Sequence, residues 1–324
     1  MGRKNALPSI WNRQQIESAI DLPYCLQKIE EGLIAAAQGN VLSPPMGFLH
    51  FNQPSGDVHI KYGYLEGQNY YVVKIASGFY GNPGLGLPSS QGVMMLFKKQ
   101  TGELESILLD EGLLTDIRTG LAGAICAKYL APPVVDCIGI IGTGTQALHQ
   151  LHALRTVISC RQVKVWGRDA SKARLFAQHP LLHFFDIEPV SALEEITKSC
   201  HLIVTTTPST SPLLFDHQLM PGTHITAVGS DAEGKQELDA SVLLQADLVA
   251  ADNLEQCRKY GELAYVPHLN SLRRLVELGQ GLAHPHLLKR EPHWSTVADL
   301  TGVAVEDIQI ASAVFEKLKG WHVQ

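Results

Sequence analysis

The feature that most constrains the fold is a glycine-rich turn near the middle of the 324-residue chain. The mostly apolar run VVDCIGII (134–141) leads directly into GTGTQA (142–147), and a segment with helical periodicity follows. A strand that enters a helix through G-x-G-x-x-A can cradle a pyrophosphate, because the glycines let the backbone approach the anion and the helix start offers free N–H groups. The pattern therefore predicts a dinucleotide site. Its expected contacts are Gly142, Thr143, Gly144, Thr145 and Gln146.

Strand and helix patterns alternate on the C-terminal side of this turn. Strands are expected at 134–141, 163–167, 184–187, 201–207, 223–229 and 248–253, with helical segments between them. Alternating β and α units of this length are typical of a doubly wound parallel sheet. The expected fold class is α/β, with a Rossmann-type domain in this part of the chain.

The N-terminal part has a different rhythm. Residues 12–38 show helical periodicity in two pieces, with a break near Asp21–Pro23. Short alternating runs separated by turn signals fill 41–109 and predict a mostly antiparallel sheet. A helix is expected from about Leu114 to Leu130, and an amphipathic helix near the C-terminus at 303–319. These segments predict a second, smaller α+β domain.

The end of the second strand of the parallel sheet bears on cofactor choice. An acidic residue there would accept from the ribose 2′-hydroxyl and favour NAD. Gly167 stands at that place, and Arg168 follows it, where a guanidinium could pair with a 2′-phosphate. The sequence thus favours NADP(H) over NAD(H). The alternative is that Arg168 and Lys172 are solvated and that Asp169 only caps the next helix.

Five motifs in order carry a resemblance to a known family. They are YYVVKIASGFYGNP (70–83), LLTDIRTGLAGAICAKYLA (113–131), GIIGTGTQA (139–147), ITAVGSDAEGKQELD (225–239) and GVAVEDIQIA (302–311). Together they resemble the ornithine cyclodeaminase/μ-crystallin family. The resemblance implies a substrate-binding and dimerisation domain at 1–130 and 301–324, a Rossmann domain at 131–300, a homodimer, and a small imino or amino acid substrate held between the domains.

Lys74 and Arg118 are the expected ligands of the substrate carboxylate. Lys74 lies in the apolar run VVKIA, where a buried ammonium needs an anion; that anion could also be a structural Asp or Glu. Arg118 lies among small helical neighbours and could grip a carboxylate through two hydrogen bonds, or form a surface salt bridge with Asp116. The resemblance implies the substrate role for both.

The carboxyl ends of two further strands are also expected to face the ligands, because open α/β sheets bind them at that edge. Asp231 follows the strand ITAVGS; the resemblance implies that it handles the proton on the substrate nitrogen, and helix capping is the alternative. Asp231 and Lys74 are therefore the expected catalytic residues. The expected cofactor contacts at this edge are Thr206 and Thr207, beside the nicotinamide ribose, and Val228, Gly229 and Ser230.

One position departs from the family pattern. Ornithine-specific members carry a carboxylate-binding arginine after a proline in the first sheet strand, and Met46 stands there in this chain. Lys61 shares a strand face with His59 and could supply the lost charge, or it could be a solvated lysine on an edge strand.

Two enzymatic functions remain open. In the first, NADPH reduces a cyclic imino acid such as Δ1-pyrroline-2-carboxylate to L-proline; Met46 and Arg168 favour it. In the second, NAD⁺ drives cyclodeamination of L-ornithine to L-proline and ammonia. An alanine dehydrogenase and a non-catalytic NADPH- or ligand-binding protein are further alternatives.

Composition excludes other classes. A net charge of −6 without a basic block argues against nucleic-acid binding, and no apolar run is long enough to span a membrane. The charged start and six dispersed cysteines predict a cytoplasmic protein with buried, reduced thiols. No metal is expected, since His284 and His286 lack a third ligand nearby.

Overall fold

The computed structural model describes residues 7–79 and 81–321, which form two compact units. Unit 1 comprises the described residues up to Arg118 and those from Ala304 onward; unit 2 is Thr119–Val303. The first division falls inside helix α3 (Leu113–Leu130) rather than at the expected 130/131, and the second falls at 303/304 rather than 300/301. The later part of α3 packs tightly within unit 2, where a Cβ on Gly120 would lie 2.5 Å from the His149 oxygen of helix α4 (Thr145–Leu154).

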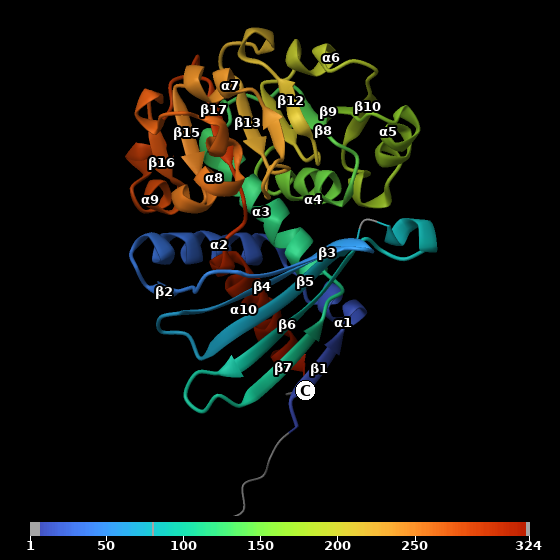
Figure 1. The fold of residues 1–324 in the computed structure, drawn as a ribbon, viewed down its shortest axis with the longest axis vertical. Coiled ribbons are helices and arrows are strands. Elements are labelled where there is room, and N and C mark those ends of the chain that lie inside the picture. The colour runs from blue at the N-terminus through green and yellow to red at the C-terminus, as the bar shows by residue number, and fades with distance from the viewer. Residues whose placement is uncertain (1–6, 80, 322–324) are drawn as a thin grey trace, which may run out of the picture. The chain divides into compact units, whose positions relative to one another are not determined.

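Unit 1 consists of one sheet and three helices, and its elements are labelled in Figure 1. The sheet order is β1-β7-β6-β5-β4-β2, with β3 also paired to β4; all pairs are antiparallel except β1–β7. The mostly antiparallel sheet is confirmed, and β1 and β3 are additions to it. The strands are β1 Ser9–Asn12, β2 Val41–Leu42, β3 Gly47–Asn52, β4 Ser55–Leu65, β5 Tyr70–Phe79, β6 Ser90–Lys98 and β7 Leu104–Leu109; the helices are α1 Arg13–Ser18, α2 Leu22–Ala37 and α10 Ala304–Trp321.

Side-chain caps set the break between the first two helices, which confirms the predicted break. Asn12 and Gln15 form a capping box at the start of α1. The Asp21 carboxylate accepts from the Tyr24 N–H at the start of α2, and Pro23 lies in its first turn, where the missing N–H costs nothing.

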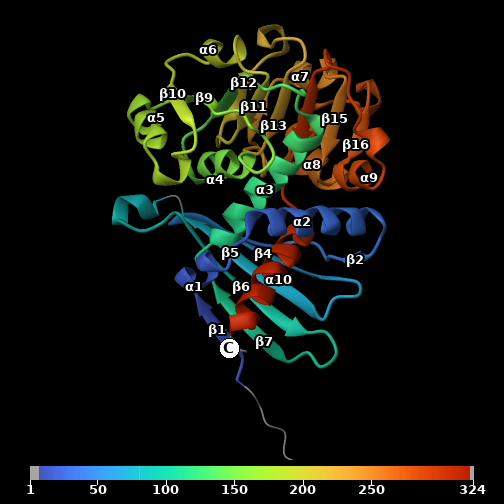
Figure 2. The same cartoon turned by 180° about the vertical axis from the view of Figure 1, so that it is seen from behind.

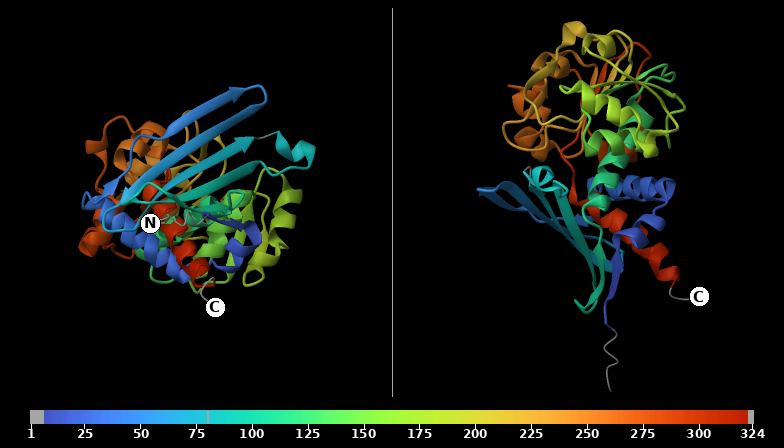
Figure 3. Two further views of the ribbon diagram at one scale, coloured as in Figure 1. Left: turned by 90° about the horizontal axis from the view of Figure 1, so that it is seen from below. Right: turned by 90° about the vertical axis from the view of Figure 1, so that its right-hand side faces the viewer.

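The sheet of unit 1 has two distinct faces. Helices α2 and α10 cover one face, and the opposite face carries no helix from the described part of the unit (right panel of Figure 3). The strand registers put one row of side chains on the covered face: Trp11, Leu108, Met94, Lys74 and Lys61. The adjacent row lies on the uncovered face: Ile10, Ile107, Met95, Val73 and Tyr62. The covered row is thus apolar from Trp11 to Met94 and ends in two lysines, Lys74 and Lys61.

Unit 2 is built on an eight-stranded parallel sheet in the order β10-β9-β8-β11-β13-β17-β15-β16, and most of this succession can be followed in Figure 2. The strands are β8 Ile138–Ile141, β9 Gln162–Trp166, β10 Asp186–Pro189, β11 Leu202–Thr205, β13 His224–Ala227, β15 Leu248–Ala251, β16 Leu275–Glu277 and β17 Thr296–Asp299; β12 (Thr210–Leu214) and β14 (Gln236–Leu238) form a small separate sheet. The helices besides α4 and the end of α3 are α5 Ala170–Ala177, α6 Glu194–Thr197, α7 Ala240–Gln245, α8 Leu254–Tyr260 and α9 Leu278–Ala283. The Rossmann-type doubly wound sheet is confirmed.

Sequence patterns missed β16 and β17. Strand β17 has four residues and lies between β13 and β15, where all its side chains are buried. A run that short, without alternation or flanking turn signals, gives no periodic signal.

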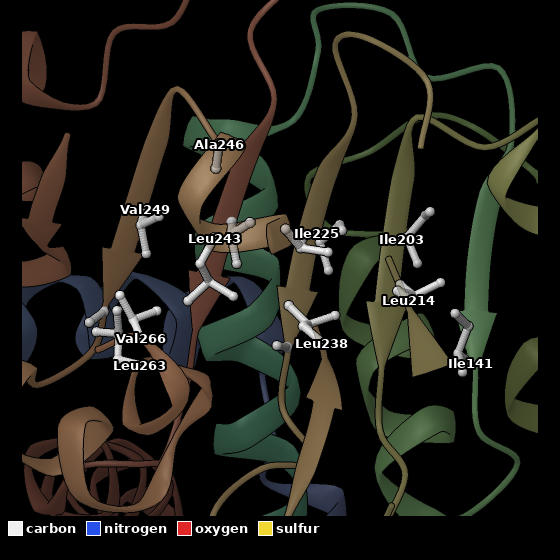
Figure 4. Close-up of a cluster of buried hydrophobic side chains, with 14 of the residues drawn as sticks. Ile141, Ile203, Leu214, Ile225, Leu238, Leu243, Ala246, Val249, Leu263 and Val266 are labelled. Carbon is white, nitrogen blue, oxygen red and sulfur yellow. The ribbon is translucent and has the colours of Figure 1, made fainter. Parts of the chain in front are cut away.

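A hydrophobic cluster packs on one face of this sheet (Figure 4). Ile141, Ile203, Ile225 and Val249 come from four of the parallel strands, and Leu214, Leu238 and Leu243 come from β12, β14 and α7. Full burial of each such side chain stabilises the folded state by about 1.5–3 kcal/mol. The cluster therefore holds the strands, and with them the strand ends, in fixed positions. Among the described helices, none is long and apolar enough to cross a bilayer.

Candidate active site

In unit 2, four neighbouring parallel strands end level with one another. Ile141 pairs with both Trp166 and Thr205, and Thr205 pairs with Ala227. The residues that follow these ends are Gly142, Gly167, Thr206 and Val228. The chain winds outward from β8 to β10 and returns on the other side at β11, so this edge is the switch point at which such sheets bind their ligands. The predicted cofactor residues are therefore brought together at one edge.

The glycine-rich turn has the geometry that a pyrophosphate requires. Gly142 has φ +123°, and a Cβ there would lie 2.3 Å from Thr206 Oγ1, so only glycine fits. A Cβ on Gly144 would meet no heavy atom within 4 Å, which leaves the backbone open at the start of α4. No side chain among the described residues caps that helix start. The turn therefore suits an anion bound by the N–H groups of α4.

The end of β9 lies against the same turn. A Cβ on Gly167 would lie 2.7 Å from Thr143 Cγ2, so an acidic side chain at this position would require a shift. Arg168, the next residue, is exposed. Asp169 accepts from the Ser171 N–H at 2.9 Å and caps α5, as the alternative for that residue expected.

Asp231 lies four residues beyond the end of β13. Its side chain is 52% exposed and pairs with Lys235 Nζ at 2.6 Å. The preceding Ser230 is buried, and its hydroxyl donates to the Lys235 oxygen at 2.7 Å. These contacts shape a short loop that presents Asp231 on its outer side.

In unit 1, Lys74 is 2% exposed and pairs with Asp307 of α10, Nζ to Oδ2, at 2.8 Å. Burial lowers the pKa of Lys74 to about 7, although Asp307 acts in the opposite direction. The sequence left open which anion pairs with Lys74; in the structure it is Asp307. A lysine with such a pKa changes charge within the physiological range.

Arg118 converges on the same carboxylate. Its Nε lies 3.1 Å from Asp307 Oδ1, and its Nη1 lies 2.7 Å from Glu306 Oε2. A surface salt bridge for Arg118 is wrong, because the residue is 6% exposed. Burial alone would raise the pKa of Asp307, but Lys74 and Arg118 hold it below its usual range.

Glu306 and Asp307 were missed from the sequence, although they lie within one of the quoted motifs. Two adjacent acids in the first turn of an otherwise buried helix were the available signal, since buried carboxylates need cationic partners.

Lys61 lies directly opposite Lys74 across the β4–β5 pair. On the other side of β4, Lys61 lies between Ile60, where the pairing with β3 ends, and Tyr64, where the pairing with β2 begins. Lys61 is half-buried, and both alternatives for it stay predictions. Met46 Sδ lies 3.1 Å from Nδ1 of His59, whose side chain shares the face of Lys61. Position 46 therefore belongs to the same face as the buried cations.

The remaining residues considered from the sequence are the histidine pair and the cysteines. The rings of His284 and His286 lie 6.1 Å apart, and no group of three or more metal-binding side chains occurs in the described part of the chain. Of the six cysteines, Cys137 and Cys160 are half-buried rather than fully buried, and none forms a disulfide.

Comparison with known proteins decides the family. The model of the ornithine cyclodeaminase/mu-crystallin family matches residues 8–321. The chain belongs to this family.

Three relatives illustrate its range. An uncharacterised cyclodeaminase of Sinorhizobium fredii is 38% identical, with 94% of this chain and 93% of that protein covered. Alanine dehydrogenase of Archaeoglobus fulgidus is 33% identical, with 95% and 94% covered. A solved archaeal alanine dehydrogenase dimer with bound NAD superposes with a TM-score of 0.88 at 31% identity, over 97% of each chain.

Other family members are named ketimine reductase mu-crystallin, iminosuccinate reductase, Δ1-pyrroline-2-carboxylate reductase and lysine cyclodeaminase. This ornithine cyclodeaminase/mu-crystallin member is therefore an enzyme, an NAD(P)-dependent imino or amino acid oxidoreductase or cyclodeaminase. Membership leaves its substrate open.

Proposed function

We propose that this enzyme uses NADPH to reduce a cyclic imino acid, with Δ1-pyrroline-2-carboxylate and L-proline as the first substrate and product to test. The observation that carries the proposal is the convergence of Lys74 and Arg118 on one buried carboxylate, with Lys61 directly opposite Lys74. Cations gathered on one face are what a small carboxylate substrate requires.

Each residue has a proposed role in this reaction. Lys74 and Arg118 hold the substrate carboxylate, with Asp307 and Glu306 keeping the two cations in place. Asp231 donates a proton to the ring nitrogen, which its exposed position in the loop after β13 allows. The Gly142 turn and Arg168 would hold NADPH, which would supply a hydride for the imine carbon; one hydride and one proton together convert the C=N bond into an amine.

Met46 favours reduction over cyclodeamination. A thioether has no charge to offer a carboxylate, and Met46 contacts His59. A rigid imino acid loses little freedom on binding and can be held by fewer contacts, whereas flexible ornithine must be held through several steps. The relative named lysine cyclodeaminase shows that the family also serves the second function.

Gly167 and Arg168 support NADPH as the cofactor. An acid at position 167, which would favour NAD, would require the Thr143 side chain to shift, and the exposed side chain of Arg168 is one residue away. Structural neighbours are described with NAD bound, so both cofactors belong in the test.

The test compares two reactions of the purified enzyme. NADPH and NADH oxidation are followed with Δ1-pyrroline-2-carboxylate, and proline formation is followed with ornithine and NAD⁺. We expect kcat/KM for the imine with NADPH to exceed that for ornithine at least tenfold. A higher value for ornithine would make the enzyme a cyclodeaminase and defeat the argument from Met46.

We also infer that the enzyme is a cytoplasmic homodimer. The uncovered sheet face of unit 1 carries the apolar row Ile10, Ile107, Met95, Val73 and Tyr62, and its end members Ile10 and Tyr62 are 60% and 41% exposed. Such a face in a single chain is typical of an interface between subunits. The free cysteines fit a reducing compartment.

A further inference from the structure

Glu237 is a buried carboxylate that the proposed mechanism does not use. It lies on β14, is fully buried, and accepts four hydrogen bonds. Oε1 accepts from the backbone N–H and the hydroxyl of Thr207, at 2.5 and 2.8 Å. Oε2 accepts from the Thr205 hydroxyl at 2.7 Å and from the Gly229 N–H at 2.8 Å. One side chain thus binds the chain segments that follow two neighbouring parallel strands.

These segments lie just beyond the last backbone hydrogen bond between the two strands. Between β11 and β13 the main chain is still bonded at Val228, whose N–H donates to the Thr205 oxygen at 3.0 Å. One residue further on, Glu237 takes over as the acceptor for Gly229. The fit is close, because a Cβ on Gly229 would lie 2.5 Å from the Glu237 carboxylate and 2.2 Å from the Thr207 oxygen.

Two further buried carboxylates hold Glu237 itself. Glu262 accepts from the N–H groups of Glu237 and Leu238, at 2.8 and 3.1 Å. Asp299 in turn accepts from the N–H groups of Glu262 and Leu263, at 3.0 and 2.9 Å. The four donors to Glu237 are neutral groups, so its burial is costly, and this raises the pKa of Glu237 to about 6.

We propose that Glu237 is a positioning residue for the nicotinamide half of the cofactor site. By binding Thr207 and Gly229 to one carboxylate, it sets the separation of the two strand-end segments that face the nicotinamide, and it fixes the start of the loop that carries Asp231. The inference rests on the proposed function only in assigning a nicotinamide dinucleotide to this edge. The adenosine half lies at the other end of the edge, at the Gly142 turn and Arg168, which Glu237 does not contact in any hydrogen bond described above.

Glu237→Gln is a sharp test because each carboxylate oxygen accepts one backbone N–H. Wherever the new amide nitrogen points, it faces a backbone N–H that has lost its acceptor, either on Thr207 or on Gly229. A hydroxyl could rotate to adapt, but a backbone N–H has no such freedom. The matched control is Asp252→Asn, another buried acid whose two oxygens accept backbone N–H groups, from Asn253 at one oxygen and from Thr301 and Gly302 at the other.

The experiment measures dissociation constants by calorimetry, at a temperature at which both variants are folded by circular dichroism. The ligands are NADPH and NADH, and the adenosine halves 2′,5′-ADP and ADP. We expect Glu237→Gln to weaken both dinucleotides about tenfold and to leave both adenosine halves within about twofold. Asp252→Asn should lower Tm but leave all four constants within about twofold.

Other outcomes overturn the proposal. Glu237 is a structural support only if Glu237→Gln weakens binding of the dinucleotides and of the adenosine halves equally. The same holds if the variant lowers Tm and leaves all four dissociation constants unchanged. If Asp252→Asn shows the same selective loss, the effect does not belong to Glu237. Because these are binding measurements, a wild type that binds NADPH but fails to reduce the imine would refute the proposed substrate and leave the role of Glu237 intact.

Discussion

At the residue scale, the chemistry of unit 1 depends on charges withdrawn from water. Lys74, Arg118, Glu306 and Asp307 are all nearly inaccessible, and each is held by an opposite charge. Removing one member of such a group leaves another uncompensated, whereas a bound substrate carboxylate adds one more partner. The protonation state of Lys74 should therefore influence substrate binding.

Lys74→Met should raise KM for the imine at least tenfold at pH 6.5. The fold should survive, because Asp307 keeps Arg118 as a partner. In the wild type KM should rise as pH increases from about 6 to 8.5, since the pKa of Lys74 is about 7 and its neutral form attracts no carboxylate. Initial rates over a pH series measure both effects.

The pH dependence of KM should be weaker in Lys74→Met. This variant is also the internal control for titration of the substrate itself. Lys61→Met should change KM only if Lys61 replaces the arginine missing at position 46. Equal KM profiles for the wild type and Lys74→Met would show that Lys74 is a purely structural ion-pair partner.

Arg168→Ala tests cofactor choice. A charge-assisted hydrogen bond to the 2′-phosphate is worth about 1.5–3 kcal/mol, so NADPH should bind more weakly by roughly one to two orders of magnitude. NADH should be nearly unaffected, because it has no phosphate there. Fluorescence titration gives both constants; equal losses would mean that Arg168 does not discriminate between the cofactors.

At the element scale, short segments in unit 2 are held by buried acids. Glu237, Glu262 and Asp299 bind the backbone just beyond β11 and β13, the backbone of β14 and the turn at Glu262–Tyr265 through oxygens that accept N–H groups. Elements of three or four residues have few hydrogen bonds of their own, so a carboxylate that accepts two at once stabilises them strongly. The acids also make the stability of this unit depend on pH.

Burial raises the pKa of Asp299 to about 7, well above the value for an unfolded chain. The folded state therefore keeps a proton that the unfolded state releases, and its contribution to stability is lost as pH rises towards 7. The free energy of unfolding of the wild type, relative to Asp299→Asn, should fall by about 1–3 kcal/mol between pH 5 and 7.5. Urea titrations of both proteins measure this difference.

Lys74 and the buried His224 titrate in both proteins, so their effects cancel in the comparison. A difference that stays constant across this range would mean that Asp299 keeps an ordinary pKa.

At the scale of the whole molecule, the uncovered face of the unit 1 sheet is the proposed interface between two copies of the chain. An apolar row crosses five strands there, and β3 adds Leu49 and Phe51, both exposed. A single chain would leave this area in water, which costs about 25 cal/mol for each Å² of apolar surface. Association of two copies, as in the proposed homodimer, would remove it from water.

Val73→Glu should convert the dimer to a monomer, because it puts a charge in the middle of this row. Light scattering should give about twice the chain mass of 35.4 kDa for the wild type and the chain mass for the variant. Leu175→Glu is the control, since Leu175 is an exposed leucine on α5 in unit 2. A wild-type monomer, or a Val73→Glu dimer, would contradict the proposed interface.

The sequence by itself determined most of the elements and named many residues of the candidate site. Local signals sufficed for the Gly142 turn, for the break near Asp21–Pro23, and for the alternation of strands and helices, because each depends on residues a few positions apart. The family motifs also named Lys74 and Arg118. Only the tertiary structure decided which buried groups meet: Asp307 beside Lys74, and the four donors around Glu237. Periodicity shows that a side chain is buried but not what it is buried against, because that partner comes from a distant segment.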